Sequence, residues 1–227
     1  MDMFVDPGLA ARAREPLAPS SVSLPPLRKP DRVDGRRLRS ERTRLLIIEA
    51  FLLLLREHPN MPTAVQIADR AGYSVRSVFQ RFPDLHALRL AAADVAMEAA
   101  IKRAPARNVD GDRASRIHAQ VETRAHTCEE WLPLWRALVA HRHESRDLEE
   151  RVQLAREVTW KRMELMYAPE LAALDEARRR RTLVALESLT DYESWSRMRH
   201  VHGLSVDEGI VAWKECVERI LPVDPIS

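Results

Sequence analysis

The feature that most constrains the fold is residues 71–88 (AGYSVRSVFQRFPDLHAL), where a glycine turn separates two helical patterns. Upstream, Thr63 is followed three residues later by Gln66 and then by an apolar pair, the pattern of a capping box that opens a helix. Gly72 tolerates a positive φ, so the chain can turn sharply after that helix. Ser74 can then cap a second helix. The segment therefore predicts two short helices joined by a tight turn.

The second of these helices is amphipathic. From Val75 onward, Val78, Phe79 and Phe82 recur at helical spacing, while the other positions are polar or basic. A helix with a small polar tip and cations along it fits the major groove of DNA. The alternative is an ordinary helical hairpin that never meets DNA.

A longer apolar helix precedes the pair and favours the DNA-binding interpretation. Residues 41–56 carry Leu45, Ile48, Leu52 and Leu55 on one helical stripe, with more large apolar side chains beside it. Three helices of these lengths make a small domain in which the first supports the other two. This is the three-helix form of the helix-turn-helix.

With these patterns in place, residues 39 to about 95 resemble the DNA-binding domain of the TetR family of transcriptional repressors. The resemblance is carried, in register, by Thr63, Ile67, Ala68, Ala71, Gly72, Ser74, Ser77, Val78, Phe79, Phe82, Pro83, Ala87 and Leu88. A final segment, SWSRMRHVHGLSVDEGIVAW, is similar to the last helix pair of many members. Two departures remove phosphate contacts, because Phe79 stands where tyrosine is usual and Leu85 where lysine is frequent.

The resemblance implies an all-α fold, with an N-terminal three-helix helix-turn-helix DNA-binding domain and a C-terminal helical ligand-binding and dimerisation domain. We expect the DNA-binding domain at residues 38–88 and the C-terminal domain at residues 89–227. The residues expected at DNA are Arg39, Thr63, Tyr73, Ser74, Val75, Arg76, Ser77, Phe79, Gln80 and Arg81. Arg76 is the best candidate for a base contact, since family members often have a small residue there; the alternative is a solvated arginine.

Basic charge is concentrated in this part of the chain. Residues 28–89 contain 13 Lys and Arg against 7 Asp and Glu, although the whole chain carries only +2. Residues 1–37 are rich in proline and scattered charge and show no periodicity, which predicts a disordered arm. Such a basic arm could reach a minor groove, or it could simply be a solubilising tail.

The rest of the chain has a helical pattern almost throughout. We expect helices at residues 84–103, from 112 with a bend near Pro133, at 145–167, at 170–200 and at 206–221. The resemblance implies a cavity here, in which a small molecule shifts the DNA-binding heads and releases the operator.

Large side chains suited to lining a cavity for an apolar or aromatic compound are Trp131, Trp135, Leu138, Trp160, Met163, Met166 and Tyr167. For any one of them the alternative is plain core packing. Arg124, His126 and Cys128 lie close by in sequence and could add polar contacts.

The resemblance also implies a homodimer, because one recognition helix reads too few base pairs and a two-fold dimer reads an inverted-repeat operator in double-stranded DNA. We expect the last two helices to form the interface as a four-helix bundle. The stripes expected there are Leu183, Leu186, Leu189, Tyr192 and Trp195 on one helix, and Ile210, Trp213, Val217, Ile220 and Leu221 on the other.

Other classes of function have little support in the sequence. No motif of a phosphate-binding loop, a catalytic triad or a zinc protease occurs, so we expect neither an enzyme nor a cofactor. The histidine pairs are two residues apart and do not share a helix face, so no metal site is expected. The apolar run 45–55 is too short to span a membrane, and nothing resembles a secretory signal, which favours a cytoplasmic protein. Two alternatives stay open: a DNA-binding regulator without an effector, and an all-helical protein-interaction module.

Overall fold

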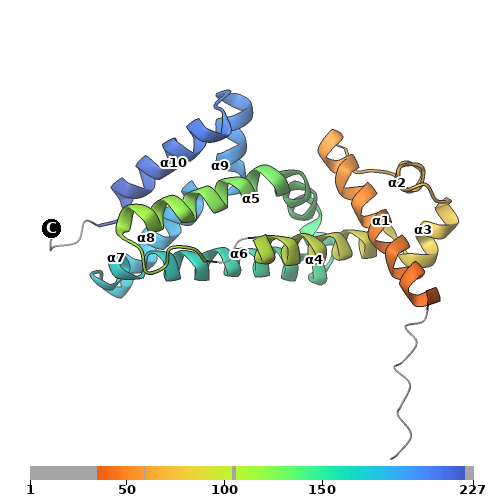
Figure 1. Ribbon diagram of the computed structural model, residues 1–227, viewed down its shortest axis with the longest axis horizontal. Coiled ribbons are helices and arrows are strands. Elements are labelled where there is room, and N and C mark those ends of the chain that lie inside the picture. The colour runs from red at the N-terminus through yellow and green to blue at the C-terminus, as the bar shows by residue number, and fades with distance from the viewer. Residues whose placement is uncertain (1–34, 59, 104–105, 223–227) are drawn as a thin grey trace, which may run out of the picture.

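The computed structural model describes residues 35–58, 60–103 and 106–222, and every regular element within these ranges is a helix. The first three helices form a head at one end of an elongated molecule, and the others form a larger body (Figure 1). The head contains α1 (Gly35–Glu57), α2 (Ala64–Ala71) and α3 (Val75–Arg81). The body contains α4 (Leu85–Arg103), α5 (Arg113–His141), η1 (Arg142–Glu144), α6 (Arg146–Met166), α7 (Ala168–Ala172), α8 (Glu176–Leu189), α9 (Tyr192–Ser196), η2 (Arg197–Val201) and α10 (Val206–Ile220).

The two short helices of the head begin and end where the sequence predicts. Thr63 and Gln66 form a reciprocal capping box, in which the Gln66 N–H donates to Thr63 Oγ1 at 3.3 Å. Gly72 ends α2 in the left-handed region, at φ 73°. The Ser74 hydroxyl then accepts the Ser77 N–H at 3.1 Å and caps α3. A helix-turn-helix therefore follows from local capping chemistry.

The first helix is longer than the apolar pattern indicates. It begins at Gly35 rather than near residue 41, so its first residues lie inside the segment 1–37 that we expected to be disordered. The apolar pattern begins only at Leu45, which is itself 47% exposed, whereas the exposed Arg37, Leu38 and Arg39 before it are good helix formers without an apolar pattern. Residues 1–34 of the expected arm lie outside the described residues.

The body is built around α5, which packs against α4, α6, α9 and α10. At one end, the buried Arg116 donates to the Met166 carbonyl at 3.0 Å and pairs with the buried carboxylate of Glu170, which fixes the end of α6 and the start of α7 to α5. At the other side of α5, Trp195 and Trp213 lie with ring centroids 4.8 Å apart in the core between α9 and α10.

The segment expected to be one helix over residues 170–200 is broken into several. Asp175 accepts the Arg178 N–H at 2.8 Å and starts α8, and Asp191 accepts the Ser194 N–H at 2.6 Å and starts α9. Aspartate at these positions competes with the continuing helix by binding backbone N–H groups two or three residues ahead. A five-residue π-helical turn, η2, then leads toward α10.

The apolar stripes that we expected at a dimer interface face inward instead. Leu183, Leu186, Tyr192, Trp195, Ile210, Trp213, Val217 and Leu221 are buried within the single chain, and Leu189 and Ile220 are partly buried against the same core. These side chains form the packing of α8 on α6 and of α9 and α10 on α5. Periodicity reports that a face is buried, and here the cover comes from the same chain.

Candidate nucleic-acid interface and ligand cavity

The helix α3 lies on the outer side of the head, away from the body (Figure 1). Its core contact is Val78, which is completely buried. On its other faces Arg76 and Gln80 are exposed, and the Phe79 ring is 44% exposed. A phenyl ring that is left this accessible beside an arginine and an amide is suited to a contact surface rather than to packing within the chain.

Other residues expected at DNA lie around α3 and divide into two groups. Ser74 at its tip, Thr63 at the start of α2 and Arg39 on the first turns of α1 are exposed. Tyr73, Val75, Ser77 and Arg81 are half-buried and also serve the head itself. The Tyr73 hydroxyl accepts from Thr43 Oγ1 at 3.3 Å, which fixes the turn to α1, and the Ser77 hydroxyl lies 2.9 Å from Ser74 Oγ.

The start of α1 brings further cations to the same side. The guanidinium of Arg44 lies 5.3 Å from the centroid of the Phe82 ring, so the first turns of α1 abut the end of α3. Arg37, Arg39 and Arg42 on those turns are exposed. With Arg76 they make the exposed surface of the head rich in positive charge, which favours contact with a phosphate backbone.

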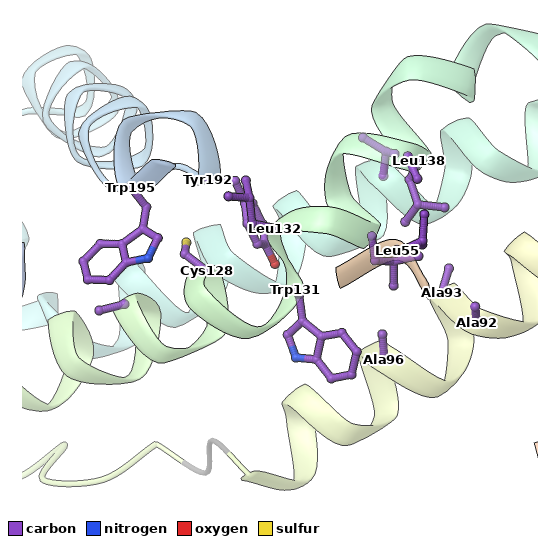
Figure 2. Close-up of a cluster of buried hydrophobic side chains, with 14 of the residues drawn as sticks. Leu55, Ala92, Ala93, Ala96, Cys128, Trp131, Leu132, Leu138, Tyr192 and Trp195 are labelled. Carbon is purple, nitrogen blue, oxygen red and sulfur yellow. The ribbon is translucent and has the colours of Figure 1, made fainter. Parts of the chain in front are cut away.

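A half-open cavity of about 820 Å³ lies in the body, bordered by α4, α5 and α6 and in part by residues of α8 and α9. Trp131, Trp135 and Leu138 line it from α5, as expected. Met97 and Ile101 line it from α4, and these the sequence did not single out. Figure 2 shows the Trp131 indole reaching from α5 toward Ala96 of α4. The lining is mainly apolar, which suits an organic ligand.

The other large side chains proposed for the cavity are not among those that line it. Met163, Met166 and Tyr167 are buried in the core, and Trp160 is half-buried and packed against it. The face of α6 that does line the cavity carries two small residues, Ala155 and Thr159, among arginines and leucines such as Arg162 and Leu165. The expected side chains therefore belong to the packed core and not to the wall of the cavity.

An arginine from α5 forms part of the cavity wall. The Arg124 Nε donates to the Thr190 carbonyl at 2.8 Å, Nη1 lies 3.5 Å from Thr159 Oγ1, and the guanidinium sits 4.8 Å from the centroid of the Tyr192 ring. Tyr192 in turn stacks on Trp135, with centroids 4.7 Å apart. The cavity therefore has a cation and two stacked aromatic rings at adjoining positions.

Two titratable neighbours of Arg124 stay uncharged. Burial raises the pKa of the Cys128 thiol to about 11, and burial likewise raises the pKa of the Tyr192 phenol to about 12. Figure 2 shows Cys128 and Tyr192 on facing elements of the same region. At neutral pH neither group offsets the charge of Arg124.

The end of α1 touches the wall of the cavity. The Arg56 guanidinium lies 5.5 Å from the centroid of the Trp131 ring, and its Nη2 lies 3.6 Å from Glu130 Oε1. Trp131 therefore has one side toward the cavity and another toward the head. This contact joins the two parts of the molecule.

Two further features concern other kinds of site. In the part of the chain that the structure describes, no group of three or more His, Cys, Asp or Glu side chains could hold a metal ion. No helix of the described ranges is long and apolar enough to cross a membrane.

Comparisons with known proteins agree with this architecture. A scan against protein-family models finds no match, and a search of the curated proteins finds none either. Among solved structures, a TetR-family transcriptional regulator from Streptomyces coelicolor matches with a TM-score of 0.66 and 19% identity, over 79% of this chain and 80% of that one. A putative TetR-family transcriptional regulator from Rhodococcus sp. matches with a TM-score of 0.58 and 15% identity, over 80% of this chain and 100% of that one. The chain therefore has the fold of the TetR-family transcriptional regulators.

Proposed function

We propose that this protein is a dimeric DNA-binding transcriptional regulator, a repressor that leaves a palindromic operator when a small apolar or aromatic effector fills the cavity. The observation that carries the proposal is the exposure of α3. It is a capped helix whose Arg76, Phe79 and Gln80 face outward from a basic head. A helix of this size fits the major groove, and its N-terminal residues reach base edges there.

Arg76 and Gln80 are four residues apart and thus lie on one face of α3. Arginine pairs bidentately with guanine, and glutamine pairs similarly with adenine, so these two side chains supply direct readout. Arg37, Arg39 and Arg42 would meet phosphates and hold the helix in register. Ser74 and Thr63, at the exposed starts of α3 and α2, would add hydroxyl contacts to the backbone.

The test is selection of bound duplexes from a random pool by the purified protein, at low and at physiological salt. An inverted repeat should be enriched, because a two-fold dimer presents two copies of α3. The Arg76→Ala variant should lose about 1–3 kcal/mol of discrimination at one position of each half-site. Arg146→Ala is the matched control, since Arg146 is exposed on α6 of the body and pairs with Glu150 in the same helix.

The outcomes decide between the proposal and its alternatives. If no sequence is enriched at either salt, the DNA-binding function is wrong and an interaction module becomes the better interpretation. If a repeat is enriched but Arg76→Ala leaves the preference unchanged, the assignment of base readout to α3 fails. A regulator without an effector would bind its operator equally well in the presence of any compound that enters the cavity.

A further inference from the structure

The cavity is polarised along α5. Gln120, Thr123 and Arg124 line it near one end of the helix, whereas Trp131 and Leu138 line it further along. At 1.5 Å per residue, the step from Arg124 to Leu138 covers about 21 Å of helix. The α5 wall of the cavity thus changes from polar to apolar along the helix, and it is long enough for an extended molecule.

The polar end is cationic. Arg162 of α6 lies there with Arg124, and its Nε donates to Gln120 Oε1 at 2.7 Å while its Nη2 lies 3.4 Å from Thr123 Oγ1. Desolvation by burial lowers the pKa of Arg162, with the like charge of Arg107 adding to the effect. Two guanidinium groups on facing helices at one end of a mainly apolar cavity create a site of positive potential.

The guanidinium of Arg124 has capacity for a ligand. Arginine has five N–H donors in a planar fork, and the contacts with Thr190, Thr159 and the Tyr192 side chain use only part of it. Glu187 and Asp191 attract Arg124 at longer range, but no carboxylate of the described residues lies within ion-pair distance of it. The Asp191 carboxylate is already engaged as the cap of α9.

Most other carboxylates of the lining are paired with cations. Asp94 pairs with Arg151 at 3.1 Å, Glu98 with Lys102 at 2.5 Å, and Glu193 with Arg136 at 2.9 Å. A cationic ligand would therefore find few free acceptors in the cavity. A buried cation without a close counter-ion gains most from an anion that brings its own hydrogen-bond acceptors.

We propose that the effector is an elongated aromatic or apolar anion, with a carboxylate or a chemically similar group at Arg124 and its apolar body along Trp135, Trp131 and Leu138. The Trp135 and Tyr192 rings stack with an interplanar angle of 15°. The guanidinium of Arg156, which also lines the cavity, lies 5.7 Å from the centroid of the Trp135 ring, so a further cation is close to the aromatic pair beside Arg124. This inference rests on the proposed function, because it names the chemical class of the ligand that the cavity takes.

The test compares two fluorescent probes with the same aromatic skeleton. The probe 8-anilinonaphthalene-1-sulfonate carries a negative charge, and N-phenyl-1-naphthylamine is neutral. The full chain should bind the anionic probe at least about tenfold more tightly, as expected for a buried charge-assisted hydrogen bond. In Arg124→Met this preference should disappear, while the neutral probe keeps its affinity within about threefold.

Control variants locate the effect. Arg146→Met removes an exposed arginine of the body and should leave both probes unchanged. Arg124→Lys keeps the charge but loses the planar fork, so it should retain part of the preference, and it serves where the methionine variant does not fold. Ala155→Trp places an indole in the cavity from α6 and should abolish the binding of both probes.

Several results would overturn the inference. These are equal affinity of the wild type for the two probes, tighter binding of the cationic dye ethidium, an equal loss of both probes in Arg124→Met, or persistent binding in Ala155→Trp. The assay contains no DNA, so its failure is distinct from that of the proposed function. A protein that selects an operator but binds both probes alike is still a regulator, with an effector of another class.

Discussion

At the scale of single residues, the structure separates the two cysteines by their surroundings. Cys128 is buried against α9, and burial raises the pKa of its thiol to about 11, whereas Cys216 on α10 is half-exposed. Thiolate is the reactive form, and a raised pKa keeps the thiol protonated at every pH well below that value. The reactivity of Cys128 should therefore increase with pH, and only as the pH approaches about 11.

We expect titration with a thiol reagent at mildly alkaline pH to modify Cys216 rapidly and Cys128 only after unfolding. In Cys216→Ser the native protein should show no rapid phase, and in Cys128→Ala the rapid phase should remain. Two thiols that react at similar rates in the native wild type would contradict the burial of Cys128.

At the scale of elements, the head was accessible from sequence because its signals are local. Thr63, Gly72 and Ser74 act on backbone groups within three or four residues, so the sequence pattern and the geometry coincide. In the body, α8 and α9 begin at similar N-terminal caps, Asp175 and Asp191. The apolar pattern continues across both positions, so it predicts one long helix. Where the apolar pattern and a capping residue disagree, the capping residue determines where the helix begins.

The cavity could be predicted only in part, and for a related reason. Trp131 and Trp135 share a face of α5 with Arg124 and Thr127, and this mixture of large, polar and small residues on one stripe is the signal of an open space. Met163 and Tyr167 lie beside Met166 at the end of α6, and several large apolar side chains together are the signal of a filled core. A sequence pattern shows that an apolar face is buried, but not whether the same chain or a second copy covers it. The sequence alone therefore could not distinguish the inward faces of α8 and α10 from a dimer interface.

The break before α8 gives a test at this scale. Asp175→Ala removes the acceptor for the Arg178 N–H and should lower the free energy of unfolding by about 1 kcal/mol. Asp175→Ser keeps an acceptor and should lose much less. Urea denaturation measures both, with Asp110→Ala as a control that removes an exposed aspartate outside any cap. Equal stability of Asp175→Ala and wild type would mean that the cap does not determine the start of α8.

At the scale of the whole molecule, the proposed dimer needs a surface other than the stripes that are buried within the chain. The outward faces of α8 and α10 offer Val184 and Val211, which are 47% and 55% exposed, together with small side chains such as Ala185. A second copy packed there would still form a four-helix bundle, with its apolar contacts on the opposite faces of the helices from those first expected.

We expect the wild type to be a dimer at micromolar concentration, and Val184→Glu or Val211→Glu to shift it toward the monomer, since each buries a charge at the interface. Light scattering measures the mass. Val65→Glu is a matched control on α2 of the head, where the valine is 57% exposed. A wild-type monomer, or dimers in both variants, would exclude this surface.

The contact between head and body sets how an effector could act on DNA. Arg56, near the end of α1, lies over the ring of Trp131, which lines the cavity from the other side. A ligand that displaces Trp131 therefore moves the support of α1, and α1 carries α2 and α3. Coupling between two binding sites is reciprocal, so if the proposed release occurs, ligand and DNA weaken each other's binding by the same factor.

We expect a saturating concentration of 8-anilinonaphthalene-1-sulfonate to weaken binding of the selected duplex by at least about fivefold, within the usual range of coupling between sites. Arg56→Gln should reduce that factor to about twofold while the affinity for the probe alone stays the same, because the link and not the cavity is altered. Arg70→Gln is the control, since it breaks an ion pair between α2 and Glu57 of α1 without touching the body. Fluorescence anisotropy of the labelled duplex, with and without the probe, gives the factor for each variant. Unchanged coupling in Arg56→Gln would mean that the contact of Arg56 with Trp131 does not connect the two sites. The alternative connection is α4, which packs against α1 and also lines the cavity.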